Sequence, residues 1–285
     1  MRWLLTGAEG MLGTDAAEVL RARGAAVTTA GRATLDVTDA TAVRAAVAGH
    51  DVVLNCAAWT AVDDAETHEA QAFAVNAVAP ALLARAAREC SARMVHISTD
   101  YVFDGRARHP YDEEAAVAPA SAYGRTKAAG EWAVRAELPH AHLVVRTAWL
   151  YGAHGRCFPR TIARAARERG EVSVVDDQHG QPTWTRDVAD LVLRLVEAGA
   201  PAGTYHATSS GATSWFGFAR EVVTAAGLDV SVVSATDSAS FSRPAARPSY
   251  SVLGHERLHA VGVAPIGDWA QRWEQAASGV LATLE

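Results

Sequence analysis

Cysteine is scarce in this chain of 285 residues, and the three cysteines lie far apart. Cys56, Cys90 and Cys157 form no CxxC pair and are odd in number, so the sequence predicts neither a disulfide framework nor a zinc site. The eleven histidines also lack a spacing that is typical of metal binding. Free thiols suit a reducing compartment, and we expect a cytoplasmic protein with no bound metal.

Long runs of one kind of residue are missing as well. No stretch of Lys and Arg offsets the formal net charge of -6, which argues against a general nucleic-acid-binding protein. No apolar run reaches the roughly 18 residues of a membrane helix, and the N-terminal apolar run of Trp3, Leu4 and Leu5 is too short for a signal peptide. We therefore expect no nucleic-acid or membrane partner, and local groups must bind any anionic ligand.

Short apolar runs alternate with longer amphipathic segments in the first half of the chain. Strands are predicted at residues 3–5, 26–29, 51–58, 93–98 and 142–147, and helices near 11–23, 68–90 and 121–137. Nearly continuous apolar strands separated by helices are typical of a parallel sheet that is covered on both faces. The pattern predicts an α/β fold, a doubly wound parallel sheet of the Rossmann type.

The pattern changes after about residue 150, where glycine, proline and tryptophan become frequent. Predicted strands shorten there to residues 172–175 and 204–206. We predict a Rossmann domain over residues 1–150 and a smaller C-terminal α/β substrate domain over residues 151–285. An amphipathic segment at about 184–200 is expected to return to the first domain. A mobile loop is expected at residues 234–249.

Three glycines follow the first predicted strand. The segment LLTGAEGMLG places Gly7, Gly10 and Gly13 in a GxxGxxG spacing at the start of a helix. Such a turn lets the backbone approach a pyrophosphate closely, with the helix N-terminus facing the anion. Glycines alone are weak evidence because turns collect them, but their place in the first βα unit predicts dinucleotide binding.

The end of the second predicted strand indicates which dinucleotide is bound. An acid there would bind a ribose 2′-hydroxyl, whereas an arginine would accommodate a 2′-phosphate. The segment VTTAGRATLDV has no acid at the strand end, and Arg32 lies in the turn. We therefore expect NADPH, with NADH also possible. Asp36 is expected near the adenine, or else as a helix N-terminal residue.

Tyr123 and Lys127 are four residues apart in a predicted helix, so both side chains project from one face. A nearby ammonium lowers the pKa of a tyrosine by stabilising its phenolate, which suits proton transfer to a carbonyl oxygen. The YxxxK spacing alone occurs by chance in many helices. Its position after the strand MVHIS, in a chain that opens with a dinucleotide loop, favours carbonyl reduction.

Together these motifs resemble those of the extended short-chain dehydrogenase/reductases, and more narrowly the dTDP-4-dehydrorhamnose reductase group. The resemblance runs from Leu5 to about Trp269 through TGAEGMLG, NCAAWTAVDDAE, VNAVAP, STDYVFDG, YGRTKAAGE, RTAWLYG, DQHGQPT and RPSYSVL. It implies a catalytic set formed by Thr99, Tyr123 and Lys127.

The resemblance also implies ligand contacts. Asn76 is expected near the cofactor, or else as a cap or buried hydrogen-bonding residue. Trp149 is expected to pack on the hexose or at the domain interface, and Arg247 to bind the pyrophosphate. The expected cofactor contacts are Gly7, Gly10, Met11, Leu12, Gly13, Arg32, Asp36, Val37, Ala57, Ala58, Asn76, Tyr123 and Lys127. The expected substrate contacts are Thr99, Asp100, Tyr123, Trp149 and Arg247.

The implied activity is NADPH-dependent reduction of the 4-keto group of a dTDP-4-keto-6-deoxy-L-hexose, as in the conversion of dTDP-4-dehydrorhamnose to dTDP-L-rhamnose. A 4,6-dehydratase is disfavoured because Tyr101 stands where its second carboxylate would follow Asp100. Three alternatives stay open: a related deoxysugar 4-ketoreductase of antibiotic glycoside biosynthesis, an epimerase, and a non-catalytic NADP-binding regulatory subunit.

The resemblance bears on oligomeric state too. Some dimeric members of the group use carboxylates around a shared Mg²⁺ at the interface. In this chain Arg186 stands where such an acid is expected. We therefore expect a monomer or a weak homodimer.

Overall fold

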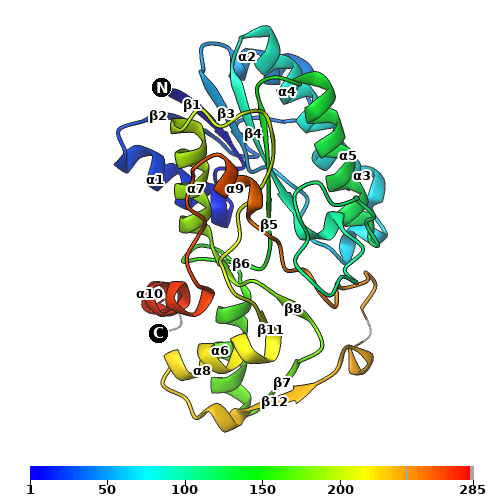
Figure 1. Cartoon of the computed structure of the whole chain (residues 1–285), viewed down its shortest axis with the longest axis vertical. Helices are drawn as coiled ribbons and strands as arrows, with labels where there is room; N and C mark the ends of the chain where they lie inside the picture. The colour runs from blue at the N-terminus through cyan, green and yellow to red at the C-terminus, as the bar shows by residue number, and fades with distance from the viewer. Residues whose placement is uncertain (242, 283–285) are drawn as a thin grey trace.

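A six-stranded parallel sheet forms one half of the molecule in the computed structural model, which describes residues 1–241 and 243–282 (Figure 1). Its order is β10-β5-β4-β3-β1-β2. The strands are β1 (Arg2–Thr6), β2 (Ala26–Ala30), β3 (Val52–Asn55), β4 (Arg93–Thr99), β5 (His142–Thr147) and β10 (Gly203–His206). All neighbouring strands pair in parallel, so the predicted α/β fold is confirmed.

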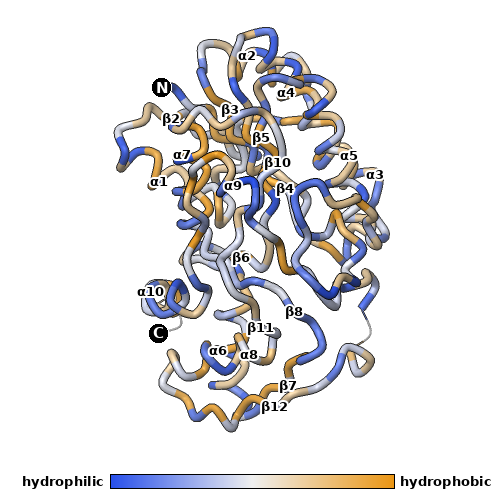
Figure 2. Tube along the Cα trace, viewed as in Figure 1, coloured by the Kyte–Doolittle hydropathy of each residue, from blue (hydrophilic) through white to orange (hydrophobic). Residues whose placement is uncertain are grey.

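Helices cover both faces of this sheet. On one face lie α1 (Met11–Ala22) and α7 (Thr185–Glu197), and on the other lie α2 (Ala40–Val47), α4 (Ala79–Glu89) and α5 (Ala122–Glu137) (Figure 1). Successive strand residues alternate between the two layers: Trp3 and Leu5 join the core under α1 and α7, whereas Leu4 joins the opposite core. Both faces are buried, which explains the nearly continuous apolar strands of the sequence and of Figure 2.

The helix predicted near residues 68–90 is one continuous helical segment made of α3 (Glu69–Phe73), a π-helical turn (Ala74–Val78) and α4. By length and composition alone, Glu69–Glu89 could cross a membrane, which the search for unbroken apolar runs missed. Half of its most apolar window is buried inside the protein, where the segment packs against α5 and α2. Core helices commonly pass the same test, so the feature is weak evidence for a membrane span.

The chain reverses its direction across the sheet between β1 and β3. After β1 it adds β2 on one side, then crosses back to place β3 on the other side of β1. Doubly wound sheets bind ligands at such a switch point, beyond the carboxyl ends of the strands. The ends of β1 and β3 are joined there by a hydrogen bond of 2.7 Å from the Thr6 hydroxyl to Asn55 Oδ1.

The other half of the molecule contains α6 (Phe158–Arg169), α8 (Trp215–Ala225) and α10 (Trp269–Leu281), with β7 (Val172–Val175) paired in parallel to β12 (Val233–Thr236) (Figure 1). Its core is aromatic, and the rings of Tyr151 and Phe218 each meet that of Trp273 edge-on. Other short strands and a short α-helix are β6 (Leu150–Tyr151), β8 (His179–Gly180), β9 (Thr183–Trp184), β11 (Thr213–Ser214) and α9 (Glu256–Ala260).

Two returning segments connect this half to the main sheet. The predicted amphipathic segment contains α7, which packs on α1. We expected the strand at residues 204–206 to belong to the smaller domain, and this was wrong: it lies in β10, which pairs with β5 at the sheet edge. A predicted strand of three residues does not indicate which strand it pairs with. Ser242, in the predicted mobile loop, and residues 283–285, in the predicted second domain, lie outside the described residues.

Candidate active site

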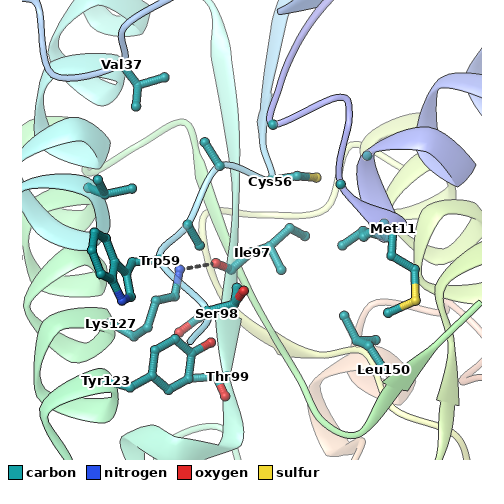
Figure 3. Close-up of a pocket in the computed structure, with 18 of the residues that line it drawn as sticks. Met11, Val37, Cys56, Trp59, Ile97, Ser98, Thr99, Tyr123, Lys127 and Leu150 are labelled. Carbon is teal, nitrogen blue, oxygen red and sulfur yellow. Dashed lines mark hydrogen bonds between the residues drawn. The ribbon is translucent and has the colours of Figure 1, made fainter. Parts of the chain in front are cut away.

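A cleft of about 1080 Å³ opens at the carboxyl edge of the sheet. It is lined by the glycine loop, by the ends of β2, β3 and β4, by α5 and by the connection that follows β5. Figure 3 shows Tyr123 and Lys127 projecting from α5 toward Thr99 at the end of β4. Every cofactor and substrate contact predicted from the sequence lines this cleft except Asn76 and Arg247.

The glycine loop forms a cradle that side chains would block. Gly7 has φ of +67°, and a Cβ there would lie 2.5 Å from the backbone nitrogen of Ala57. A Cβ at Gly13 would clash with the carbonyl oxygen of Gly7. Gly10 caps α1 without a side-chain hydrogen bond, and the first turn of α1 holds no acid. The helix N-terminus therefore keeps its free N–H groups and positive partial charge, which fits a pyrophosphate.

The catalytic set predicted from the sequence comes together where α5 meets the end of β4. Ser121 caps α5 by accepting a hydrogen bond of 3.1 Å from the backbone N–H of Gly124. A Cβ at Gly124 would clash with the carbonyl oxygen of Tyr101, so glycine allows the helix to start directly against the strand end. Tyr123 lies in the first helical turn and Lys127 one turn later, and both are buried.

Lys127 is held by the strand. Its Nζ atom donates a hydrogen bond of 2.6 Å to the backbone carbonyl of Ile97, and burial lowers the pKa of the amine to about 8. His96 Nε2 lies 3.5 Å from the same Nζ atom. Asn55 Oδ1 accepts from the N–H of Ala57, so its amide nitrogen faces His96 Nδ1 at 3.0 Å. His96 thus carries its proton on Nε2, facing Lys127, whereas the negative charge of Glu131 favours the charged amine.

Tyr123 remains protonated at neutral pH in this structure. Burial raises the pKa of its phenol, the negative charge of Asp100 raises it further, and a hydrogen bond with Thr99 lowers it. The expectation that Lys127 lowers the pKa of Tyr123 was wrong here. The physical reason is that desolvation of the phenolate dominates while the lysine directs its hydrogen bond to Ile97.

Asp100 fixes the direction of the Thr99 hydroxyl. Thr99 Oγ1 donates a hydrogen bond of 2.9 Å to Asp100 Oδ1 and accepts one of 3.3 Å from the N–H of Tyr101. Burial raises the pKa of Asp100 to about 6, against the lowering effect of hydrogen bonds from Ser251 and Thr99. The ring of Tyr101 meets that of Tyr123 edge-on, with centroids 5.5 Å apart. Tyr101 therefore lines the cleft beside the ring of Tyr123.

Asn76 links two elements that border the cleft. Its Oδ1 accepts a hydrogen bond of 2.8 Å from the N–H of Trp59, and its amide nitrogen donates to the Trp59 carbonyl and to Thr126 Oγ1. The residue is fully buried in the π-helical turn and joins the loop after β3 to α5. Of the two roles expected for Asn76, this geometry matches the buried hydrogen-bonding residue.

Arg247 lies beside the cleft, in an adjoining pocket of about 130 Å³ that Tyr101 and Ser121 also line. Its guanidinium donates a hydrogen bond of 2.8 Å to Asp63 Oδ2, and Arg243 lies 3.8 Å from the same oxygen. Asp63, which no sequence motif marks as a site residue, therefore holds the loop that carries Arg243 and Arg247 against the main domain. A phosphate contact by Arg247 stays a prediction.

Trp149 lines the cleft and also joins the two halves of the molecule. It has φ of +47°, and its indole stacks on that of Trp215 with centroids 3.5 Å apart. A Cβ at Gly180 would clash with the indole of Trp149, so this glycine makes room for it. The stacking is that of domain-interface packing, and contact with a hexose stays a prediction.

The sequence motifs did not predict a buried ion pair that lies between α5 and β5. Arg146 on β5 and Glu131 on α5 are fully buried and pair through two hydrogen bonds of 2.9 Å and 2.8 Å. Ser98 Oγ donates a third of 2.6 Å to Glu131. The network joins α5 to β4 and β5 beside Thr99. No local signal could have revealed it, because Glu131 and Arg146 are 15 residues apart in separate motifs and meet only when α5 packs on β5.

One cluster within the described residues has the composition of a cation site. Ligand atoms of Asp15, Glu18 and His154 lie within 4.8 Å of one another. Asp15 already accepts a hydrogen bond from Thr185, and Arg186 lies 3.7 Å from Glu18. This arginine neutralises part of the cluster, and no function is assigned to it.

Comparisons with known proteins agree with this geometry. Residues 1–281 match the family model described as RmlD substrate binding domain. A dTDP-4-dehydrorhamnose reductase from Streptomyces griseus is 50% identical over 274 residues, which cover 94% of this chain and 90% of the relative. The chain belongs to the dTDP-4-dehydrorhamnose reductase family.

Other relatives of this family member carry related names. A dTDP-4-keto-6-deoxy-D-glucose reductase from Streptomyces niveus is 46% identical, with 96% of each chain covered. A solved dTDP-4-dehydrorhamnose reductase from Bacillus anthracis, in complex with NADP, superposes with a TM-score of 0.93 at 35% identity and covers 96% of this chain and 98% of its own. The family predicted from the sequence motifs is thus confirmed.

Proposed function

We propose that this reductase-family member reduces the 4-keto group of a dTDP-4-keto-6-deoxy-L-hexose with NADPH, converting dTDP-4-dehydrorhamnose to dTDP-L-rhamnose. The observation that carries the proposal is the meeting of Thr99, Tyr123 and Lys127 in the cleft that the glycine loop also lines. The names of the relatives and the NADP complex of the Bacillus anthracis enzyme support the substrate and the cofactor.

The protein's own residues account for the proton and for positioning. When bound, NADPH supplies a hydride to C4 of the ketosugar. Tyr123, kept protonated by burial, donates its phenol proton to the carbonyl oxygen as negative charge develops there. The Thr99 hydroxyl turns from Asp100 Oδ1 to donate a hydrogen bond to the same oxygen. Lys127, held at Ile97, binds the nicotinamide ribose.

The substrate side calls for local cations, because the chain is acidic overall. We propose that Arg247 binds the substrate pyrophosphate and that Asp100 and Trp149 contact the sugar. Arg247 is only partly buried at the mouth of its pocket, where its pairing with Asp63 holds the guanidinium near the cleft. A pyrophosphate would then compete with Asp63 for the arginine.

A related 4-ketoreduction is the second candidate. The Streptomyces niveus relative is named for a 6-deoxy-D-glucose substrate and is nearly as similar as the dehydrorhamnose reductase from Streptomyces griseus. The two candidates use the same proton donor and cofactor. They differ in the hexose, so identification of the product separates them.

The test supplies enzymatically generated dTDP-4-keto-6-deoxy-L-hexulose and its D-gluco counterpart in parallel, each with NADPH. We expect NADPH oxidation with the L-hexulose, and NMR of the isolated product should identify dTDP-L-rhamnose. Preference for the D-gluco substrate would establish the second candidate. Binding of NADPH without oxidation in the presence of either sugar would contradict both and favour a regulatory subunit.

We further propose a cytoplasmic monomer or weak homodimer. All three cysteines are free, which suits a reducing compartment. Arg186 pairs with Glu18 within its own chain, which supports the absence of a metal-bridged dimer. Sedimentation with and without Mg²⁺ tests the oligomeric state: a Mg²⁺-dependent dimer would contradict the proposal.

A further inference from the structure

Glu9 occupies the space beside the end of β2 where a side chain of residue 31 would lie. Gly31 is the first residue after β2, the position from which an acid would reach the adenosine ribose. A Cβ built on Gly31 would clash with the carboxylate of Glu9. Gly31 does not have positive φ, so its backbone alone does not require glycine. The carboxylate that the strand lacks is therefore supplied by the β1–α1 loop.

The backbone keeps Glu9 in this place. The neighbouring Ala8 donates a backbone hydrogen bond of 3.3 Å to Ala30, the last residue of β2. On the other side, the N–H of Gly10 bonds to Gly7 at 3.1 Å, which closes the turn that carries Glu9. The loop and the end of β2 thus form one hydrogen-bonded unit.

The turn after β2 is equally constrained. The N–H of Gly31 donates to Thr34 Oγ1 at 3.0 Å, and its carbonyl accepts hydrogen bonds from the N–H groups of Thr34 and Leu35. Glu9 and Arg32, both exposed, line the same end of the cleft as Gly31. Among the described residues, the Glu9 carboxylate has no hydrogen-bond or ion-pair partner and is available to a ligand.

We propose that Glu9 is the ribose-binding acid of this protein and sets its balance between NADH and NADPH. Its carboxylate accepts a hydrogen bond from the 2′-hydroxyl of NADH and repels the 2′-phosphate of NADPH, which Arg32 attracts. Two opposite charges at one end of the cleft make the protein a dual-cofactor enzyme with only modest preference for NADPH. The inference rests on the proposed function for the presence of a dinucleotide, but not on the identity of the sugar.

The test measures dissociation constants of NADPH and NADH by calorimetry, with kcat/KM for both cofactors as a second readout. Glu9→Gln keeps the size of the side chain and removes its charge. We expect it to tighten NADPH, weaken NADH and shift the ratio of the two dissociation constants about tenfold toward NADPH, as for loss of one charge repulsion at a partly exposed site. Arg32→Gln is the matched control and should shift the ratio about tenfold toward NADH.

A double variant moves the acid back to the strand. In Glu9→Ala/Gly31→Asp the loop carboxylate is lost and a new one follows β2, so NADH binding should recover relative to Glu9→Ala alone. A ratio that changes less than twofold in Glu9→Gln, while Arg32→Gln shifts it, would overturn the role of Glu9 and leave the proposed function intact. If the wild-type protein bound neither dinucleotide, the proposed function itself would fail.

Discussion

The Nζ atom of Lys127 donates a hydrogen bond of 2.6 Å to the backbone carbonyl of Ile97, which connects the helix α5 to the strand β4 (Figure 3). The lysine is buried, and desolvation lowers the pKa of its amine from 10.5 to about 8. At neutral pH the folded protein therefore bears the cost of a buried ammonium. A buried ammonium that lowers the stability of the ligand-free protein is expected of a residue that binds a ligand, and not of one that stabilises the fold.

Lys127→Met should make the ligand-free protein more stable and inactive. Because the folded pKa lies below the unfolded value, the penalty is fully present below pH 8 and disappears as the pH rises toward 10.5. Once the lost hydrogen bond to Ile97 is subtracted, we expect the free energy of unfolding to increase by about 1 to 3 kcal/mol at pH 7. Urea unfolding of both proteins at pH 7 and pH 10 measures it, and a variant that is less stable at pH 7 would contradict the explanation.

Tyr123→Phe should abolish proton donation while leaving the cleft intact. We expect kcat to fall by about 10² to 10⁴, the usual contribution of a general acid. The affinity for NADPH should stay within about twofold, because the ring that packs beside Tyr101 is retained. Single-turnover NADPH oxidation and calorimetric binding check the two parts. Turnover equal to that of the wild type would eliminate Tyr123 as the acid.

Removal of one partner from the buried pair of Glu131 and Arg146 should be costly. Arg146→Met leaves the buried Glu131 carboxylate with only the partly exposed Arg135 as a cationic partner, and we expect a loss of about 3 kcal/mol in the free energy of unfolding. In the double variant Glu131→Leu/Arg146→Met, most of that loss should be recovered. Denaturant unfolding of the wild type, the double variant and the two single variants Arg146→Met and Glu131→Leu forms a double-mutant cycle. Equal losses in the single and double variants would show that packing, not the buried charge, causes the effect.

The same pair predicts a decrease of stability in acid. Hydrogen bonds and ion pairs from Arg146 lower the pKa of Glu131 below 4.5 despite burial. A lowered folded pKa means that the stabilisation is complete above pH 4.5 and is lost as the pH falls through the folded value. Wild-type protein should lose more stability than the Glu131→Leu/Arg146→Met variant between pH 5 and pH 3, as followed by thermal unfolding. Parallel curves would contradict this.

Asp100 should have the opposite pH dependence. Burial raises its pKa from 3.8 to about 6, so between these values the folded protein binds a proton that the unfolded chain has released. Wild-type stability should therefore fall relative to Asp100→Asn as the pH rises from 4 to 6, by up to about 3 kcal/mol. Asn retains an oxygen acceptor for the Thr99 hydroxyl. A constant difference between the two proteins across this range would show that Asp100 does not titrate there.

Residues that act through local spacing were predictable from the sequence. The period of the apolar runs predicted a parallel sheet with helices on both faces, and the observed helices α1, α5 and α7 begin and end within three residues of the bounds of the predicted segments. The glycine loop and the pair of Tyr123 and Lys127 lie within single βα units or helices. These motifs therefore do not depend on how distant segments of the chain are arranged. They pointed to a dinucleotide-dependent reductase from the sequence.

Contacts between distant segments were decided only by the tertiary structure. Three features depend on how strands and loops are ordered in space. They are the ion pair of Glu131 with Arg146, the ion pair of Asp63 with Arg247 and the position of β10 at the sheet edge. The pKa of Tyr123 likewise depends on burial, which spacing does not report. Glu9 shows the difference most clearly: the end of β2 contains no acid in sequence, yet the fold brings one there from a loop some twenty residues earlier, because Ala8 is hydrogen-bonded to Ala30.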